Sequence, residues 1–369
     1  MIPASRWLAS WQALGRPFLH LPRPAAALVL ALLAAALAWS AFASLPQDRA
    51  NPSAPTVAAP ANTAPSQRAK GDMALYARIS ARMVRGEGYY HAALAEQRAG
   101  NYPTRPFVAV RLPTLAAMQA AIGPDGVRGL ALVLAAAAMA ALWWRSPPLG
   151  TREERIFATA LLAAGGGAAL SPVAGYDHDF IAGLLLTFAL LAYRPHCWWP
   201  ALLAAAAALA VRELAAPFVM LWLVFALIEG RRGEAFALAA VLALFAGGLA
   251  AHAHAVDAAR LPGDLVSQGW SAMAGYSLPL AGLGQLTGLR HLPPMLAAPL
   301  AVLPLVGWAG LGGRLGLFAA LWFAGVATMI ALFARPANFY WVELALPAYA
   351  IGLAFAPRAL GEMLRSAAR

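Results

Sequence analysis

The chain has 369 residues, of which 61% are hydrophobic and only 12% charged, with a mean hydropathy of +0.64. A soluble domain is usually about 45–50% apolar and about 25% charged, so this composition excludes an ordinary soluble protein and predicts an all-α polytopic membrane protein. The net charge of +11 comes from basic residues scattered among apolar runs, which argues against nucleic-acid binding. Cys197 is the only cysteine, so an intrachain disulfide is excluded.

Ten apolar segments approach the length of about 20 residues that a membrane-spanning helix needs. The first follows Arg6, Arg16 and Arg23 and has no clear cleavage site, so we expect an uncleaved anchor, although Ala43 and Ser44 leave cleavage as a signal peptide open. Several segments are short, so tilt, bilayer thinning or burial among neighbouring helices is expected. The predicted spans are residues 24–45, 128–144, 156–174, 180–193, 198–211, 215–228, 235–255, 293–311, 315–334 and 342–356.

The distribution of arginines predicts the orientation. With the N-terminus inside, short cytoplasmic segments hold thirteen arginines and short outer loops hold four, as the positive-inside rule requires. Residues 198–228 could form one long helix, but Arg212 and Glu213 would then lie in mid-bilayer. Residues 107–123 could also span, but they carry Arg111 and Pro113, so we expect a helix at, or dipping into, the outer interface. Both termini are therefore expected on the cytoplasmic side.

One long hydrophilic segment, residues 46–127, is predicted to be an extracytoplasmic loop within a single integral-membrane domain, 1–369. Residues 51–66 are rich in Pro and Ala and are expected to be a flexible tether. Residues 73–85 predict an amphipathic helix whose apolar face rests at the membrane interface and whose arginines reach lipid phosphates. Asp72 precedes it and is either a helix N-cap or a functional carboxylate, or both. The apolar face comprises Leu75, Tyr76, Ile79 and Met83, and the basic face Arg78, Arg82 and Arg85.

The short outer loops carry further ionisable residues. Asp177 and Asp179 bracket His178, and two aspartates at this spacing either converge on one hard cation or form a solvated turn. Arg212-Glu213 interrupts an apolar region and marks either a functional site or a local ion pair. The last span opens on a polar and aromatic run that includes Arg335, Asn338, Tyr340, Trp341 and Glu343, and a weaker metal-like pattern is formed by His252, His254 and Asp257.

Together these motifs resemble the GT-C superfamily of integral-membrane glycosyltransferases. The resemblance rests on Asp72 to Tyr76 with Tyr89-Tyr90 after it, on Arg105-Pro-Phe and Arg111-Leu-Pro, on the 171–179 loop, and on Val211-Arg-Glu. It covers roughly residues 25–255, and Asp72 stands there without the second acid that many members have beside it.

The resemblance implies transfer of a sugar from a polyprenyl-phosphate donor to a hydroxyl on a lipid, glycan or protein. It makes Asp72 the general base and Asp177 with Asp179 a candidate site for a divalent cation, Mg or Mn. The donor phosphate would bind to Arg105, Arg111, Arg212 and Arg335. The acceptor or sugar would contact Tyr76, Asp177, His178, Asp179, Glu213, Asn338 and Tyr340.

Two other classes of function fit the sequence. A transporter or lipid flippase would carry charges within its spans and repeated halves, and a non-catalytic protein of cell-envelope assembly would tolerate loss of Asp72. For the transferase we expect a multi-pass protein of the bacterial inner membrane, with its active site on the periplasmic or exterior face.

Overall fold

The computed structural model describes residues 15–43, 65–145 and 149–369, with side chains from residue 71 onward in the second range. Arg6 and most of the predicted tether 51–66 lie outside these ranges. Within them the chain is helical, with one isolated bridge and no strand. The α-helices are α2 (Arg23–Ala43), α3 (Pro65–Val84), α4 (Tyr89–Ala99), α5 (Pro113–Trp143), α6 (Arg152–Gly166), α7 (His178–Ala192), α8 (Trp199–Val211), α9 (Ala216–Ile228), α10 (Arg232–Ala258), α11 (Ser277–Leu286), α12 (Pro294–Leu311), α13 (Gly313–Phe333) and α14 (Leu346–Ala368).

Short 3₁₀ helices connect several of these elements. They are η1 (Pro17–His20), η2 (Phe107–Ala109), η3 (Gly167–Leu170), η4 (Ala174–Tyr176), η5 (Glu213–Ala215), η6 (Gly288–His291) and η7 (Pro336–Leu344).

The helices confirm a membrane-embedded protein, while the number of spans stays a prediction. In the described ranges five helices are long and apolar enough to cross a bilayer: α2, α5 together with η2, α10, α12 and α13. The pair η7 and α14 makes a sixth, bent by 72°. The helices α7 and α8 and the segment Glu213–Ile228 are apolar but shorter. Nearly every side chain of α7 is buried, so this helix is covered by protein rather than by lipid.

Proline and glycine set several helix boundaries. Pro113 and Pro294 stand at the first position of α5 and α12, where a missing N–H costs nothing. Within α5, Gly123 has φ of 74° and Pro124 follows it, so the helix breaks there. The segment before this break corresponds to part of the region 107–123, and it is separate from the apolar helix after it. Its place relative to the membrane interface stays a prediction.

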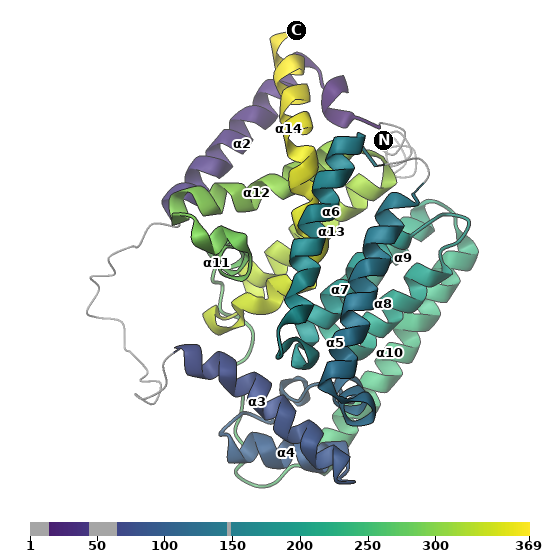
Figure 1. Ribbon diagram of the computed structural model, residues 1–369, viewed down its shortest axis with the longest axis vertical. Coiled ribbons are helices and arrows are strands. Elements are labelled where there is room, and N and C mark those ends of the chain that lie inside the picture. Colours follow the sequence, from purple (N-terminus) through teal and green to yellow (C-terminus); the bar gives the residue numbers. More distant parts are fainter. Residues whose placement is uncertain (1–14, 44–64, 146–148) are drawn as a thin grey trace.

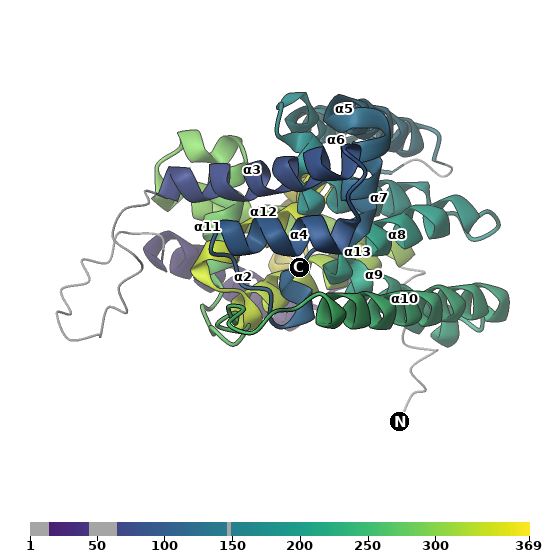
Figure 2. The same ribbon diagram turned by 90° about the horizontal axis from the view of Figure 1, so that it is seen from below.

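The helices α3 and α4 lie across one end of the bundle, and the C-terminal end of α14 lies at the other (Figure 1). Figure 2 shows the bundle from the end that α3 and α4 cover. The starts of α5 and α7, the break between α8 and α9, and the C-terminal half of α10 reach this same end. We call it the α3/α4 end.

The predicted interfacial helix is wrong in its surroundings. The apolar residues Leu75 and Ile79 of α3 are buried in a cluster with residues of α4, α5 and α10, rather than presented to lipid. Arg78 and Arg82 pair with carboxylates of the protein, Glu96 and Glu87 among them, rather than pointing to lipid phosphates. Burial against protein is possible because α4 and the α10 end supply a second apolar surface.

Three further elements differ from the sequence predictions. The helix α4 was not predicted, and it contains Tyr89 and Tyr90: Tyr89 donates to the Arg111 carbonyl at 2.5 Å and Tyr90 contacts His252 at 3.2 Å. The helix α11 lies in what was predicted to be an outer loop. The helix α14 runs twelve residues past the predicted end of the last span at 356, because its amphipathic end packs against η1 and α6.

Candidate functional site

A polar cluster lies at the α3/α4 end of the bundle. Arg111 is at the centre of this cluster. Its Nε donates to the Tyr76 hydroxyl at 3.1 Å, and its Nη2 donates to the Tyr340 hydroxyl at 3.3 Å. The same guanidinium lies 3.9 Å from an Asp179 oxygen and 4.0 Å from a Glu213 oxygen. One side chain therefore joins α3, α7, η5 and η7, which are far apart in the sequence.

Arg212 completes the ion pairing. It is only 1% exposed; its Nε donates to Asp179 at 2.7 Å and its Nη1 to Glu213. Its guanidinium also lies 5.9 Å from the centre of the Trp341 ring. Two arginines thus face two carboxylates, which is the condition under which buried charge is tolerated. The predicted local ion pair at Arg212-Glu213 is present, and it belongs to a larger network.

Asp72 lies in the interior of α3, which begins seven residues earlier at Pro65, so its predicted role as a helix N-cap is wrong. The Tyr102 hydroxyl donates a hydrogen bond to its carboxylate. Burial raises the pKa of Asp72 above its ordinary value, and Tyr102 and the nearby Arg111 only partly oppose that shift. A carboxylate with a raised pKa is a stronger base than a solvated one.

Tyr76 stands one helical turn after Asp72, on the same face of α3. Burial raises the pKa of Tyr76 to about 12, so its hydroxyl keeps its proton. The hydroxyls of Tyr76 and Tyr340 accept from Arg111, and Tyr340 also accepts from the Asn338 amide at 3.3 Å. A hydroxyl that accepts retains one O–H to donate, so both tyrosines can offer a hydrogen bond to a bound oxygen atom.

The predicted pair Asp177 and Asp179 does not present a shared face to a cation. Asp177 accepts from the Phe180 N–H at 3.0 Å as N-cap of α7 and forms a hydrogen bond with Glu343, while Asp179 pairs with Arg212. Burial and the nearby Asp179 raise the pKa of Asp177, which favours a shared proton in its bond with Glu343. In the described ranges no group of three or more His, Cys, Asp or Glu could hold a metal. The arrangement does not favour a cation at this place.

His178 and His252 have structural partners. The His178 ring is 4% exposed, packs edge-on against Tyr76 at 4.7 Å and contacts the Tyr176 carbonyl. His252 lies between the Tyr90 hydroxyl and the Val110 carbonyl and ties α10 to the first loop. Asp257 pairs with Arg260, so the weaker metal-like pattern is divided among separate contacts.

The four arginines predicted to bind phosphate fall into two pairs. Arg111 and Arg212 share their charge with Asp179 and Glu213. Among the residues with described side chains, neither Arg105 nor Arg335 has a carboxylate partner, and the Nε of each is buried without a hydrogen-bond acceptor. The cluster around Arg111 is therefore electrically matched, while Arg105 and Arg335 carry free positive charge.

Sequence reasoning missed Tyr102 and underrated Glu343. Tyr102 lies alone in a loop and carries no pattern, and it reaches Asp72 only because the turn after α4 folds back; its hydroxyl would lie 2.8 Å from a Cβ built at Gly71. Glu343 did carry a signal, since it is an ionisable residue within a predicted span.

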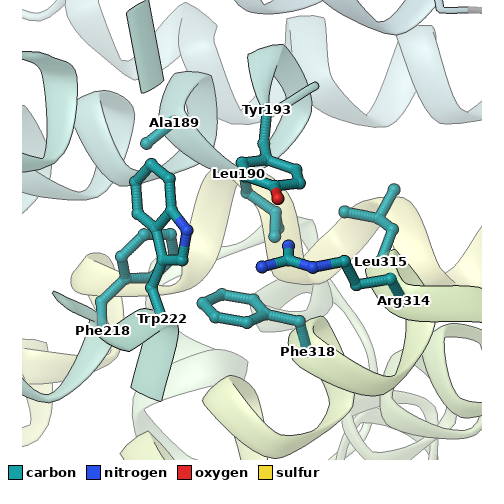
Figure 3. A pocket seen from close by; sticks show the side chains of 8 residues that line it. All are labelled: Ala189, Leu190, Tyr193, Phe218, Trp222, Arg314, Leu315 and Phe318. Atoms are coloured by element: carbon teal, nitrogen blue, oxygen red, sulfur yellow. The ribbon is translucent and has the colours of Figure 1, made fainter. Parts of the chain in front are cut away.

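A small cavity lies at the opposite end of α7 (Figure 3). Its volume is about 10 Å³, room for about one water molecule, and Tyr193, Trp222 and Arg314 are among its lining residues. Since α7 has 15 residues, its two ends lie about 22 Å apart. The cavity is therefore distant from the polar cluster and does not form part of it.

No protein-family model, curated protein or solved structure matches the chain. The resemblance to membrane glycosyltransferases therefore rests on the sequence motifs alone.

The buried pairing of Arg212 gives a testable stability difference. Arg212→Gln leaves Asp179, which is 2% exposed, without its nearest cation, and breaking a buried pair on one side costs about 3–5 kcal/mol. We expect a clearly lower unfolding temperature of the detergent-purified protein. Arg85→Gln is the matched control, because the Arg85 side chain is 63% exposed and lies 3.9 Å from Glu87. Equal unfolding temperatures for the two variants would contradict the pairing.

Proposed function

We propose that this chain is an integral-membrane glycosyltransferase that moves a sugar from a polyprenyl-phosphate donor to a hydroxyl acceptor. The observation that carries the proposal is the setting of Asp72: a carboxylate of raised pKa, hydrogen-bonded by Tyr102 and close to Arg111, whose guanidinium contacts two tyrosine hydroxyls able to donate. A base beside an anion-binding cation and neutral hydrogen-bond donors suits the reaction of an alcohol with a sugar phosphate. The acceptor is a lipid, a glycan or a protein.

In this mechanism Asp72 takes the proton of the acceptor hydroxyl as its oxygen attacks the anomeric carbon. The bond from that carbon to the phosphate oxygen breaks, and the lipid phosphate leaves with the electron pair. General-base catalysis of this kind contributes typically 10²–10⁴-fold. Tyr76 and Tyr340 orient the sugar or acceptor through their free O–H groups.

The leaving phosphate needs cationic or hydrogen-bonding groups fixed in advance, because such groups stabilise developing charge most in a water-poor site. Arg111 lies close enough to Asp72 to lower its pKa, and Arg105 and Arg335 have no competing carboxylate among the side chains described. Arg212, with Asp179 and Glu213, holds Arg111 in place. Since Asp177 and Asp179 are already engaged, no step is assigned to a divalent cation.

The orientation follows from the arginine distribution. The α3/α4 end carries the segments assigned to the outside, so the site would face the periplasm or exterior of a bacterial inner membrane. A polyprenyl-phosphate donor, unlike a cytosolic nucleotide sugar, can be presented on that side.

The location of the buried charges favours a transferase over a transporter. Arg212 and Asp179 lie at one end of the bundle, and the buried Glu234, which accepts from Tyr193 at 3.2 Å, lies at the other. A transport pathway would instead place ionisable groups along the spans. A non-catalytic assembly protein would have no need of a base with a raised pKa.

Asp72→Asn removes the base and keeps the size of the side chain. We expect transfer to fall by about 10²–10⁴-fold, with membrane insertion and yield unchanged. The variant is expressed in a strain that lacks the chromosomal gene. The assay measures the transfer of radiolabelled sugar from the lipid fraction of this strain to the acceptor. Transfer at the wild-type rate by this variant would remove Asp72 from the mechanism.

Tyr102→Phe tests the environment of that base. The Tyr102 hydrogen bond lowers the pKa of Asp72, so its loss raises that pKa further, and less of the basic form is present at a given pH. We expect the acid limb of the pH–rate profile to move to higher pH, with the rate recovering at alkaline pH. Tyr90→Phe is the control, since Tyr90 contacts His252 instead. An acid limb at the same pH as in the wild type would show that Tyr102 does not influence the pKa of the titrating group.

Chelation tests the expected cation. Because Asp177 and Asp179 are held by Glu343 and Arg212, we expect transfer to persist in EDTA. The measurement compares initial rates before and after chelation and after addition of Mg or Mn. A loss of activity in EDTA that Mg or Mn restores would contradict this expectation and indicate that these two carboxylates bind a metal.

A further inference from the structure

The connection between α10 and α11, residues 259–276, exposes large apolar side chains at the α3/α4 end. Val266 is 66% exposed, Met273 69% and Leu265 50%. Ordered connections longer than about 12–15 residues are uncommon and are usually functional. Exposed apolar residues on such a connection in a membrane protein indicate contact with lipid.

This connection is anchored along its length. Asp264 pairs with Arg98 at 2.7 Å, and the Leu265 carbonyl accepts from the Thr104 N–H at 3.0 Å. At its other side, the Met273 N–H donates to the Leu332 carbonyl at 3.2 Å. The apolar side chains are therefore presented by a fixed backbone.

Met273 itself has φ of 47°, in the left-handed region that large side chains rarely adopt. This conformation is held by the hydrogen bond to Leu332 and leaves the thioether side chain directed outward.

Two arginines flank the connection. The Arg105 backbone exchanges hydrogen bonds with Leu265 and Ser267, and the Arg335 Nη1 donates to the Gln268 side chain at 3.2 Å. Of the four arginines predicted to bind phosphate, these are the two without a carboxylate partner among the described side chains. Their positive charge is therefore not neutralised by a carboxylate among the described side chains, and the forked guanidinium group suits the geometry of a phosphate.

The flanked connection adjoins the polar cluster on two sides. Trp270 packs edge-on against Trp341, with ring centres 5.8 Å apart, and Trp341 in turn lies under Arg212. On the Arg105 side of the connection, Tyr102 stands three residues before Arg105 in the chain and is hydrogen-bonded to Asp72.

We propose that residues 265–273, with Arg105 and Arg335, bind the polyprenyl monophosphate of the donor. The phosphate contacts the two guanidinium groups, and the first isoprene units lie along Leu265, Val266 and Met273. Charge complementarity selects a phosphate, and the apolar side chains beside it select one that carries a hydrocarbon chain. This assignment rests on the proposed function, because the lipid is that of the donor.

The test measures binding and needs no turnover. Full-length protein is placed in nanodiscs of neutral phosphatidylcholine, and undecaprenyl phosphate binding is followed by native mass spectrometry. We expect the double variants Arg105→Gln/Arg335→Gln and Val266→Asp/Met273→Asp to bind about tenfold or more weakly than wild type, since each loses charged or apolar contacts. Aspartate tolerates the left-handed backbone at 273, so the second double variant retains the fold.

Arg290→Gln is the matched control, because it removes one positive charge from the predicted outer side and none from this site; we expect unchanged binding. Wild-type affinity in both double variants, or equal displacement of the probe by phosphatidylglycerol, would overturn the assignment and leave the proposed function standing. Absence of undecaprenyl phosphate binding by wild-type protein would overturn both.

Discussion

The pairing of Arg111 and Arg212 with Asp179 and Glu213 is the constraint on which the rest of the site depends. A charge removed from water within a membrane protein must meet an opposite charge, and Arg212 does so through Asp179 and Glu213. These residues come from the start of α7 and the break between α8 and α9. Arg111 then reaches the same carboxylates from the segment before α5, so the helix ends are brought into a single arrangement.

This arrangement also determines which groups are available for chemistry. The pairing with Asp179 and Glu213 fixes the Arg111 guanidinium, which holds the Tyr76 and Tyr340 hydroxyls and lies close to Asp72. Asp72 lies outside the matched set, and burial gives it a raised pKa. The carboxylates that pair with arginines are therefore different from the carboxylate proposed to react, although all of them lie at the same end of the bundle.

The short length of helix α7 is explained by burial rather than by adaptation to lipid. The helix α7 has 15 residues and is enclosed by α5, α8, α14 and η7. Gly183 permits this enclosure, since a Cβ there would overlap the Glu343 carbonyl oxygen. At the far end of α7, Glu234 accepts from Tyr193 and from Trp222, so polar groups satisfied by protein close both ends. A helix protected in this way need not match the full thickness of a bilayer.

The sequence by itself determined that this is a helical membrane protein, because apolar length and composition are local properties that no folding can hide. It also located most helix boundaries and most residues of the polar cluster. An ionisable residue beside an apolar run is costly to bury, so it rarely occurs there without a structural or functional role. The tertiary structure alone decided which charges are paired: Asp179 meets Arg212 rather than a cation shared with Asp177, and α3 buries its apolar face against protein. It alone brought Tyr102 to Asp72. Such contacts join residues distant along the chain, and their energies depend on distances that no periodicity encodes.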